Sequence, residues 1–148
     1  DETVAPKAGG DMRIRLMTIG DYDQVVVVWK AAGLKVDMVN DSKTALAMIL
    51  ALNPSSCFVA YEENKIIGAV LGAFNGKRLW IYHLGVLPEL QWRGIGKALL
   101  ARVEGVAAEM GVPKVCLGVD VKNIRALQFY VRKGYQVERE ALWLYKSL

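Results

Sequence analysis

The sequence contains few of the side chains that metal sites and disulfide frameworks require. Its 148 residues include two cysteines and one histidine. Cys57 and Cys116 lie far apart in apolar stretches, and together with His83 they are too few for a zinc site of the usual ligand count. We therefore expect no metal site and two reduced cysteines in the core. The alternative is a catalytic cysteine partnered by His83.

Long apolar runs and clusters of one charge are absent too. No apolar run approaches the roughly 20 residues that span a bilayer, and no signal segment opens the chain. We expect a soluble, cytoplasmic protein that binds no membrane. The formal net charge is +4, but the 19 Lys and Arg residues form no long run and do not alternate with aromatic residues. This pattern disfavours nucleic-acid binding and equally suits a small polyanionic ligand.

The length predicts one domain, and the order of elements predicts a mixed α/β fold. Residues 1–11 are small and polar, so we expect a flexible leader or a cloning remnant before a domain at 12–148. The expected elements are a strand at 12–17, helices from Thr18 or Asp21 to 32 and from Asp41 or Ser42 to 52, strands at 56–62, 65–74 and 79–86, a helix at 95–110, a strand at 115–119, a helix at 123–133 and two weaker strands toward Leu148.

Two turns and one strand in this series carry more specific expectations. Asn75-Gly76 is a two-residue hairpin signal, and a short turn is expected around Glu63-Asn64. The run 79–86 is apolar or aromatic almost throughout, which predicts a central strand buried on both faces.

The most informative stretch is Leu84–Leu100, where a buried strand ends, a loop turns, and Gly94 and Gly96 open a long helix. Glycine lets the backbone approach an anion closely, and the first unpaired N–H groups of the helix point toward it. The helix dipole favours negative charge at the same place. Arg93 and Lys97 would add positive charge at the rim. The stretch therefore predicts a pyrophosphate site.

Two familiar phosphate motifs do not fit this stretch. A Rossmann fingerprint needs a third glycine where this chain has Leu99. A Walker loop needs a glycine at Gln91, and Ser or Thr where Ala98 follows Lys97. The alternative is that the two glycines merely form a tight strand-to-helix turn.

The wider pattern Gln91-x-x-Gly94-x-Gly96 resembles the Gln/Arg-x-x-Gly-x-Gly/Ala signature of the GNAT superfamily of N-acetyltransferases. The resemblance implies a mixed, mostly antiparallel central sheet flanked by about four helices. It also implies that acetyl-CoA or CoA is the cofactor, with its pantetheine arm held by the strand end and its pyrophosphate by the loop. The implied residues are Leu84, Gly85 and Val86 for the arm, and Gln91, Trp92, Arg93, Gly94, Ile95, Gly96 and Lys97 for the pyrophosphate.

A second stretch, from Asn123 to Tyr135, is similar to the later helix motif of the same family, Asn-x-x-Ala-x-x-Phe-Tyr-x-x-x-Gly-Phe. Asn123, Ala126 and Tyr130 are three and four residues apart, so they share one helix face, and the resemblance places all three at the cofactor. Asn123 can also cap the helix. The Tyr130 hydroxyl would protonate or stabilise the departing thiolate, because the ordinary pKa of a phenol is near 10.

The general base is harder to identify. Members of this family often carry Glu or His on the strand before the phosphate loop, but here that strand offers no carboxylate. Histidine has an ordinary pKa near neutrality, which makes His83 a candidate base. Tyr82, expected on the opposite face of the strand, is the second candidate and could order a relay water. An isolated histidine is also commonly a core residue.

The predicted activity is transfer of an acetyl group from acetyl-CoA to a primary amine, by direct attack in a ternary complex. The acceptor would be a small molecule, a protein N-terminus or a lysine. Scattered carboxylates such as Asp37, Asp41 and Glu62 could attract a cationic amine. The alternatives are a non-catalytic CoA-binding sensor or regulatory domain of the same fold, and a binding module for another phosphate ligand or nucleic acid. A homodimer is left open.

Overall fold

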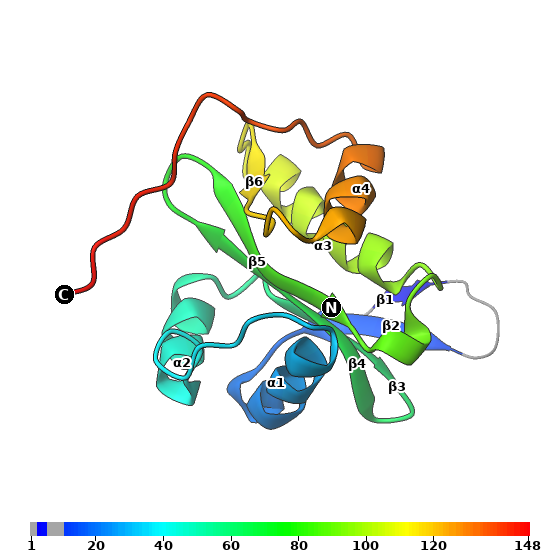
Figure 1. Cartoon of the computed structure of the whole chain (residues 1–148). Coiled ribbons are helices and arrows are strands. Elements are labelled where there is room, and N and C mark those ends of the chain that lie inside the picture. Colours follow the sequence, from blue (N-terminus) through cyan, green and yellow to red (C-terminus); the bar gives the residue numbers. More distant parts are fainter. Residues whose placement is uncertain (1–2, 6–10) are drawn as a thin grey trace. The chain divides into compact units, whose positions relative to one another are not determined.

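The computed structural model describes residues 3–5 and 11–148, in two compact units that divide after Leu117. The first unit contains strands β1 (Thr3–Ala5), β2 (Met12–Leu16), β3 (Phe58–Glu62), β4 (Lys65–Phe74), β5 (Leu79–Val86) and β6 (Val115–Leu117), with helices α1 (Tyr22–Ala31), α2 (Lys43–Leu52) and α3 (Ile95–Glu109) (Figure 1). The second unit contains helix α4 (Ile124–Arg132).

The six strands form one sheet in sequence order, β1 to β6. The neighbours from β1 to β5 are antiparallel, and β6 pairs with β5 in parallel. A parallel neighbour requires a crossover, and α3 provides it. The fold is thus the expected mixed, mostly antiparallel sheet, and β4 and β5 have the predicted bounds.

Helices cover both faces of the sheet, with α1 and α2 on one side and α3 on the other (Figure 1). A Cβ added to Gly68 or Gly72 of β4 would meet side chains of α3, whereas one added to Gly85 of β5 would meet Trp29 of α1. Trp29 and Leu99 are both almost completely buried. These contacts define an α1 face and an α3 face. Strand β5 was expected to be buried on both faces, but Tyr82 is 45% exposed, so this expectation holds only in part.

Helix α1 forms although Val25–Val28 are β-branched and favour strands. Val25, Val28 and Trp29 are buried on the inner side of this helix. Burial of an amphipathic face contributes more to helix formation in proteins than intrinsic propensity does, so tertiary packing decides the outcome here.

Of three local expectations, one was wrong, the short turn around Glu63-Asn64 is confirmed, and one falls mostly outside the described residues. The turn at Asn75-Gly76 has four residues, because Phe74 pairs with Leu79 and the Asn75 side chain accepts the N–H groups of Lys77 and Arg78. The two-residue hairpin lies instead at Glu63-Asn64, where both residues have positive φ. Most of the leader expected at residues 1–11 lies outside the described residues, and Thr3–Ala5 pair with β2.

The two strands expected near the C-terminus are not formed within the second unit. Residues 135–148 have irregular structure, and nearly all of their side chains are exposed. Apolar residues such as Leu142 and Trp143 suggested strands in the sequence, but a strand also needs a hydrogen-bonded neighbour. Among the described helices of both units, none is long and apolar enough to cross a bilayer.

The close approach of β4 to the segment before β3 gives a stability test. A Cβ on Gly72 would lie 2.6 Å from the backbone oxygen of Ser56, whereas one on Gly105, on the exposed side of α3, would meet nothing within 4 Å. We expect Gly72→Ala to lower the free energy of unfolding by about 1–3 kcal/mol through overpacking. Gly105→Ala should raise it by about 0.5–1 kcal/mol, because alanine is the better helix former.

Urea unfolding of the two variants and the parent protein measures both changes. Equal stability of the Gly72→Ala variant and the parent would contradict the tight packing at this position.

Candidate active site

The loop between β5 and α3 is fastened to the end of the strand. After β5 ends at Val86, Pro88–Leu90 make one turn of 3₁₀ helix. Gln91 then reaches back, and its Nε2 donates a hydrogen bond of 3.1 Å to the carbonyl oxygen of Val86. Gln91 was predicted as a cofactor residue, and in the structure its side chain sets where the loop leaves the strand.

The start of α3 leaves backbone N–H groups available. The first helical hydrogen bond runs from the N–H of Ala98 to the oxygen of Gly94, 3.0 Å away. The N–H groups of Ile95, Gly96 and Lys97 therefore precede the first bond of the helix, as in any α-helix. Gly94, the N-cap residue, has no side chain to cap them. Such a helix end binds anions through its N–H groups and its dipole.

The backbone before α3 adopts left-handed conformations that place the helix start. Gly94 has φ of 83°, which glycine adopts without strain. Trp92 has φ of 70°, which is unfavourable for an aromatic residue. Alternating right-handed and left-handed residues turn successive N–H groups toward one concave side, an arrangement that also favours anions. The strained Trp92 is consistent with a functional loop.

Charge around this helix start is positive. The first turn of α3 contains no acidic residue, and Lys97 lies there with an exposed side chain. Arg93 lies just before the helix, 3.7 Å from the carboxylate of Glu62 on β3. Both basic residues lie at the helix start, where the Arg93 charge is paired with Glu62, and their contact with an anion stays a prediction.

Strands β5 and β6 pair only over a short length. Their register runs from Leu79 with Val115 to Ile81 with Leu117, although β5 continues to Val86. The backbone of β5 beyond Ile81 thus extends past its parallel neighbour on the side that leads to the phosphate loop. This is the segment in which Leu84, Gly85 and Val86 were predicted to hydrogen-bond a ligand.

A bulge interrupts β5 at His83. Ala69 pairs with Gly85 and Leu71 pairs with Tyr82, so β5 has one residue more than β4 between these pairs. His83 has φ of 51°, the left-handed conformation that a bulge residue can adopt.

Because of the bulge, the expected opposition of Tyr82 and His83 is wrong. Tyr82 pairs with Leu71, whose neighbour Gly72 faces α3, so Tyr82 points to the α1 face. His83 packs on that same face, where its ring centroid lies 4.9 Å from that of Trp29. Both candidate bases therefore point to one side of the sheet.

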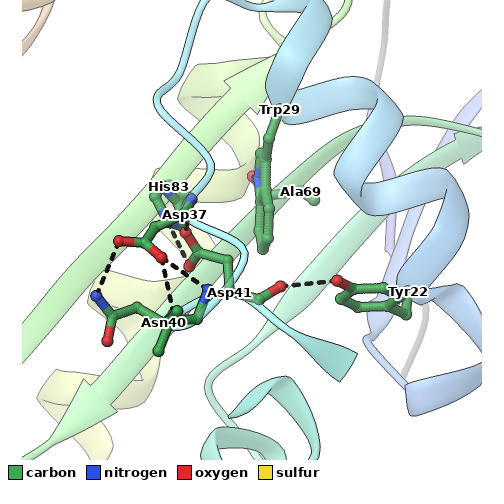
Figure 2. Close-up of polar contacts among 8 residues, drawn as sticks. Tyr22, Trp29, Asp37, Asn40, Asp41, Ala69 and His83 are labelled. Atoms are coloured by element: carbon green, nitrogen blue, oxygen red, sulfur yellow. Dashed lines mark hydrogen bonds and ion pairs between the residues drawn. The ribbon is translucent and has the colours of Figure 1, made fainter. Parts of the chain in front are cut away.

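His83 has a carboxylate partner from the segment between α1 and α2. Its Nε2 lies 2.8 Å from Oδ1 of Asp41 (Figure 2). The two side chains are 22% and 12% exposed, so water reaches the pair only in part. Trp29 packs beside the ring, and its Nε1 donates to the oxygen of Ala69 where the β4–β5 ladder is interrupted. The strand itself carries no carboxylate, but the fold supplies one.

Sequence reasoning missed this pairing. It considered Asp41 as the start of a helix and as one of several scattered acids. The two residues are 42 positions apart, and neither helical nor strand periodicity connects them. The available signal was limited to an acid directly before Ser42, which caps α2 by accepting the N–H of Ala45.

The second unit organises the later motif within itself. Asn123 caps α4, and its side-chain oxygen accepts the N–H of Ala126 at 3.1 Å, which confirms the predicted cap. Tyr130 packs edge-on against Phe129 and Tyr135, with ring centroids 5.1 Å and 5.5 Å away. Helix α4 ends in a Schellman motif at Gly134, in which the backbone N–H of Tyr135 donates to the backbone carbonyl oxygen of Tyr130. The approach of Tyr130 to a cofactor sulfur stays a prediction.

The Tyr130 phenol differs from a solvated one. Burial raises its pKa to about 12. At neutral pH the hydroxyl is therefore protonated and serves as a hydrogen-bond donor. Full proton transfer from it to a thiolate, whose ordinary pKa is near 8.5, would be uphill. This favours stabilisation over protonation among the two predicted roles.

Of the two cysteines, Cys57 does not suit the alternative role of a catalytic nucleophile. Both are free, Cys57 is buried, and burial raises the pKa of its thiol to about 11. A thiol with that pKa is a poor nucleophile at neutral pH. In residues 3–5 and 11–148, no three His, Cys, Asp or Glu side chains cluster as metal ligands would.

The chain thus folds as an α/β domain with a mixed sheet, and its uncapped helix N-terminus after β5 is of the kind that favours anions. Residues 29–135 match the acetyltransferase (GNAT) family. The match spans more than half of the chain, which therefore belongs to this family.

Individual relatives agree with this assignment. An acetyltransferase of Sodalis glossinidius (strain morsitans) is 30% identical over 137 residues, covering 93% of this chain and 96% of the relative. An aminoglycoside acetyltransferase from an uncultured soil metagenomic sample, solved with trehalose, is 27% identical with a TM-score of 0.73, covering 93% and 96% of the two chains. The PaiA N-acetyltransferase of Thermoplasma acidophilum, solved with coenzyme A, shares the fold at 22% identity, with a TM-score of 0.77 and coverage of 86% and 91%.

Proposed function

We propose that this chain transfers the acetyl group of acetyl-CoA to a primary amine. The acceptor is a small molecule, a protein N-terminus or a lysine, and it reacts by direct attack in a ternary complex. The observation that carries the proposal is the start of α3, whose uncapped N–H groups follow a loop that Gln91 ties to the end of β5. Family membership and the CoA complex of the PaiA relative support the same cofactor.

The described residues fit a cofactor that carries a pyrophosphate. The N–H groups of Ile95, Gly96 and Lys97 would hold its negative oxygens, and the Arg93 and Lys97 side chains would add charge from the rim. The backbone of β5 beyond Ile81 would pair with the amide groups of a pantetheine arm, as a neighbouring strand would. The residues proposed to hold the cofactor are Leu84, Gly85, Val86, Gln91, Trp92, Arg93, Gly94, Ile95, Gly96, Lys97, Asn123, Ala126 and Tyr130.

When bound, acetyl-CoA supplies the acetyl group as an activated thioester. The chain's own contribution is to place donors where charge develops in the transition state. Backbone N–H groups of Leu84–Val86 would donate to the thioester oxygen. The neutral Tyr130 hydroxyl would donate to the sulfur as it becomes a thiolate. A donor that is already aligned in a partly dry site is worth more than the same donor in water.

The amine must be neutral before it attacks, because an ammonium has no lone pair. His83 and Tyr82 are the proposed groups near this step. Both point to the α1 face of the sheet, and His83 is paired with Asp41. This carboxylate weakens the case for a non-catalytic CoA sensor, which rested on the absence of an acidic residue near the expected base.

The activity test measures thiol release from acetyl-CoA with a panel of amines, after calorimetry has shown binding of CoA. The proposal predicts CoA binding and amine-dependent thiol release with at least one of the aminoglycosides, polyamines or N-terminal peptides in the panel. CoA binding without thiol release for any amine supports the sensor. Absence of CoA binding by the folded protein contradicts both functions.

The proposed role of Tyr130 predicts a specific kinetic change. Tyr130→Phe removes the hydroxyl and keeps the ring that packs between Phe129 and Tyr135. We expect kcat to fall roughly 100-fold, the usual cost of one lost transition-state donor. The Kd for CoA should change by about twofold at most, because the interaction belongs to the transition state.

Phe129→Leu, which alters the packing around Tyr130 but keeps its hydroxyl, is the matched control. Unchanged turnover of a folded Tyr130→Phe variant would remove Tyr130 from the mechanism.

A further inference from the structure

Asp41 is held at each of its polar groups. Its backbone N–H donates to the backbone carbonyl oxygen of Asp37 at 2.7 Å, and its backbone carbonyl oxygen accepts the Tyr22 hydroxyl at 2.8 Å. Its Oδ2 accepts the N–H of Asp37 at 2.8 Å, which leaves Oδ1 facing His83 (Figure 2). The carboxylate therefore has one orientation, with each oxygen assigned to a different partner.

This arrangement determines which nitrogen of His83 carries the proton in the neutral ring. An ionised carboxylate only accepts hydrogen bonds, so Nε2 at 2.8 Å must be the donor. A neutral imidazole carries one proton, which leaves Nδ1 with its lone pair. Trp29 packs against the ring at 4.9 Å and restricts its rotation. The bulge at His83 fixes the backbone from which the ring projects.

We propose that Asp41 is the positioning residue for the general base of this acetyltransferase, holding His83 with Nε2 protonated and Nδ1 free to accept a proton. This inference rests on the proposed function and adds the residue that prepares the base. The other titratable groups beside the pair are Asp37 on the same segment, Tyr22 of α1, whose hydroxyl donates to the Asp41 carbonyl oxygen, and Tyr82 next to His83 in β5. Asp37 has its own partners, since its Oδ1 accepts the N–H of Val39 and its Oδ2 faces the Asn40 amide.

The proton balance is as follows. His83 Nδ1 takes one proton from the acceptor's ammonium and becomes an imidazolium, which the Asp41 carboxylate stabilises. The freed lone pair forms the new C–N bond to the acetyl carbon, and the C–S bond breaks with its electron pair on sulfur. After the C–N bond has formed, the nitrogen still carries one proton more than the amide product, and this proton goes to the sulfur. The products are the amide, the CoA thiol and protonated His83, which returns its proton to water.

The substitution Asp41→Asn separates positioning from mere packing. Asparagine offers one oxygen and one NH₂ group. Its oxygen must remain on the N–H of Asp37, which can only donate, so the NH₂ group faces Nε2 of His83. Nε2 must then accept, and the proton moves to Nδ1. The variant keeps the shape of the site but leaves the base nitrogen protonated.

The chain has a single histidine, so its ring signals in long-range ¹H–¹⁵N correlation spectra need no assignment. At alkaline pH we expect the wild-type protein to show a protonated Nε2, and Asp41→Asn to show a protonated Nδ1. With an active amine, kcat of this variant should fall roughly 100-fold, within the range of general-base effects. Affinity for CoA should stay within about twofold of the parent.

Three further variants complete the test. Asp23→Asn removes an exposed carboxylate from the first turn of α1, so tautomer and turnover should match the parent. His83→Gln removes the base and should lose as much kcat as Asp41→Asn. The double variant should lose little more, because the two residues act as one unit.

Two results would overturn the inference. One is a loss of turnover in Asp41→Asn with the wild-type tautomer retained, which would make Asp41 only a structural tie. The other is the reversed tautomer with normal turnover, which would exclude His83 Nδ1 as the base. Failure of the proposed function looks different, since the wild-type protein would then release no thiol with any amine while the spectra still report the Asp41–His83 bond.

Discussion

The account depends on the way α3 begins. Its first N–H groups have no carbonyl one turn earlier, and Gly94 as N-cap provides no side chain for them. A helix end of this kind needs a partner from water or a ligand. Gln91, bonded to the last residue of β5, fixes this helix end next to the strand. The proposed anion would thereby be placed by backbone groups, with the Arg93 and Lys97 side chains at its rim.

Strand β5 connects the proposed halves of the reaction. Its C-terminal end leads into the loop 87–94, which is proposed to hold the pyrophosphate. Its bulge turns His83 toward α1 and toward the segment between α1 and α2. Both features arise from departures from a regular strand, one at His83 and one where pairing with β6 stops after Ile81. A strand paired regularly on both edges would offer no free backbone to a ligand. The irregular part of the sheet is therefore the part that the proposal uses.

The sequence predicted most of the elements because local signals are strong in this chain. Apolar runs bounded by turn residues gave β4 and β5 their bounds, and helical spacing with Gly111 after it gave α3. Asn123 was correctly expected to cap α4. Where prediction failed, the missing information was tertiary. The run 79–86 is apolar or aromatic almost throughout, and nothing in it signals an extra residue at His83.

The contact between Asp41 and His83 was beyond sequence reasoning for the same reason. It depends on the path of the segment between α1 and α2, which the Tyr22 hydroxyl and the Asp37 backbone fix in the folded chain. The apolar residues near the C-terminus show the converse error. Leu142 and Leu144 fit a strand pattern, but residues 135–148 form no strand within their unit.

Chemical-shift mapping tests the central claim most directly. In ¹⁵N-labelled protein, CoA should shift the amide signals of Ile95, Gly96 and Lys97 more than those elsewhere in α3. Pantetheine, which lacks the pyrophosphate, should leave these three signals almost unchanged, because the proposed contact is between backbone N–H groups and phosphate oxygens. Equal shifts with both compounds, or CoA shifts that spare the start of α3, would contradict the account.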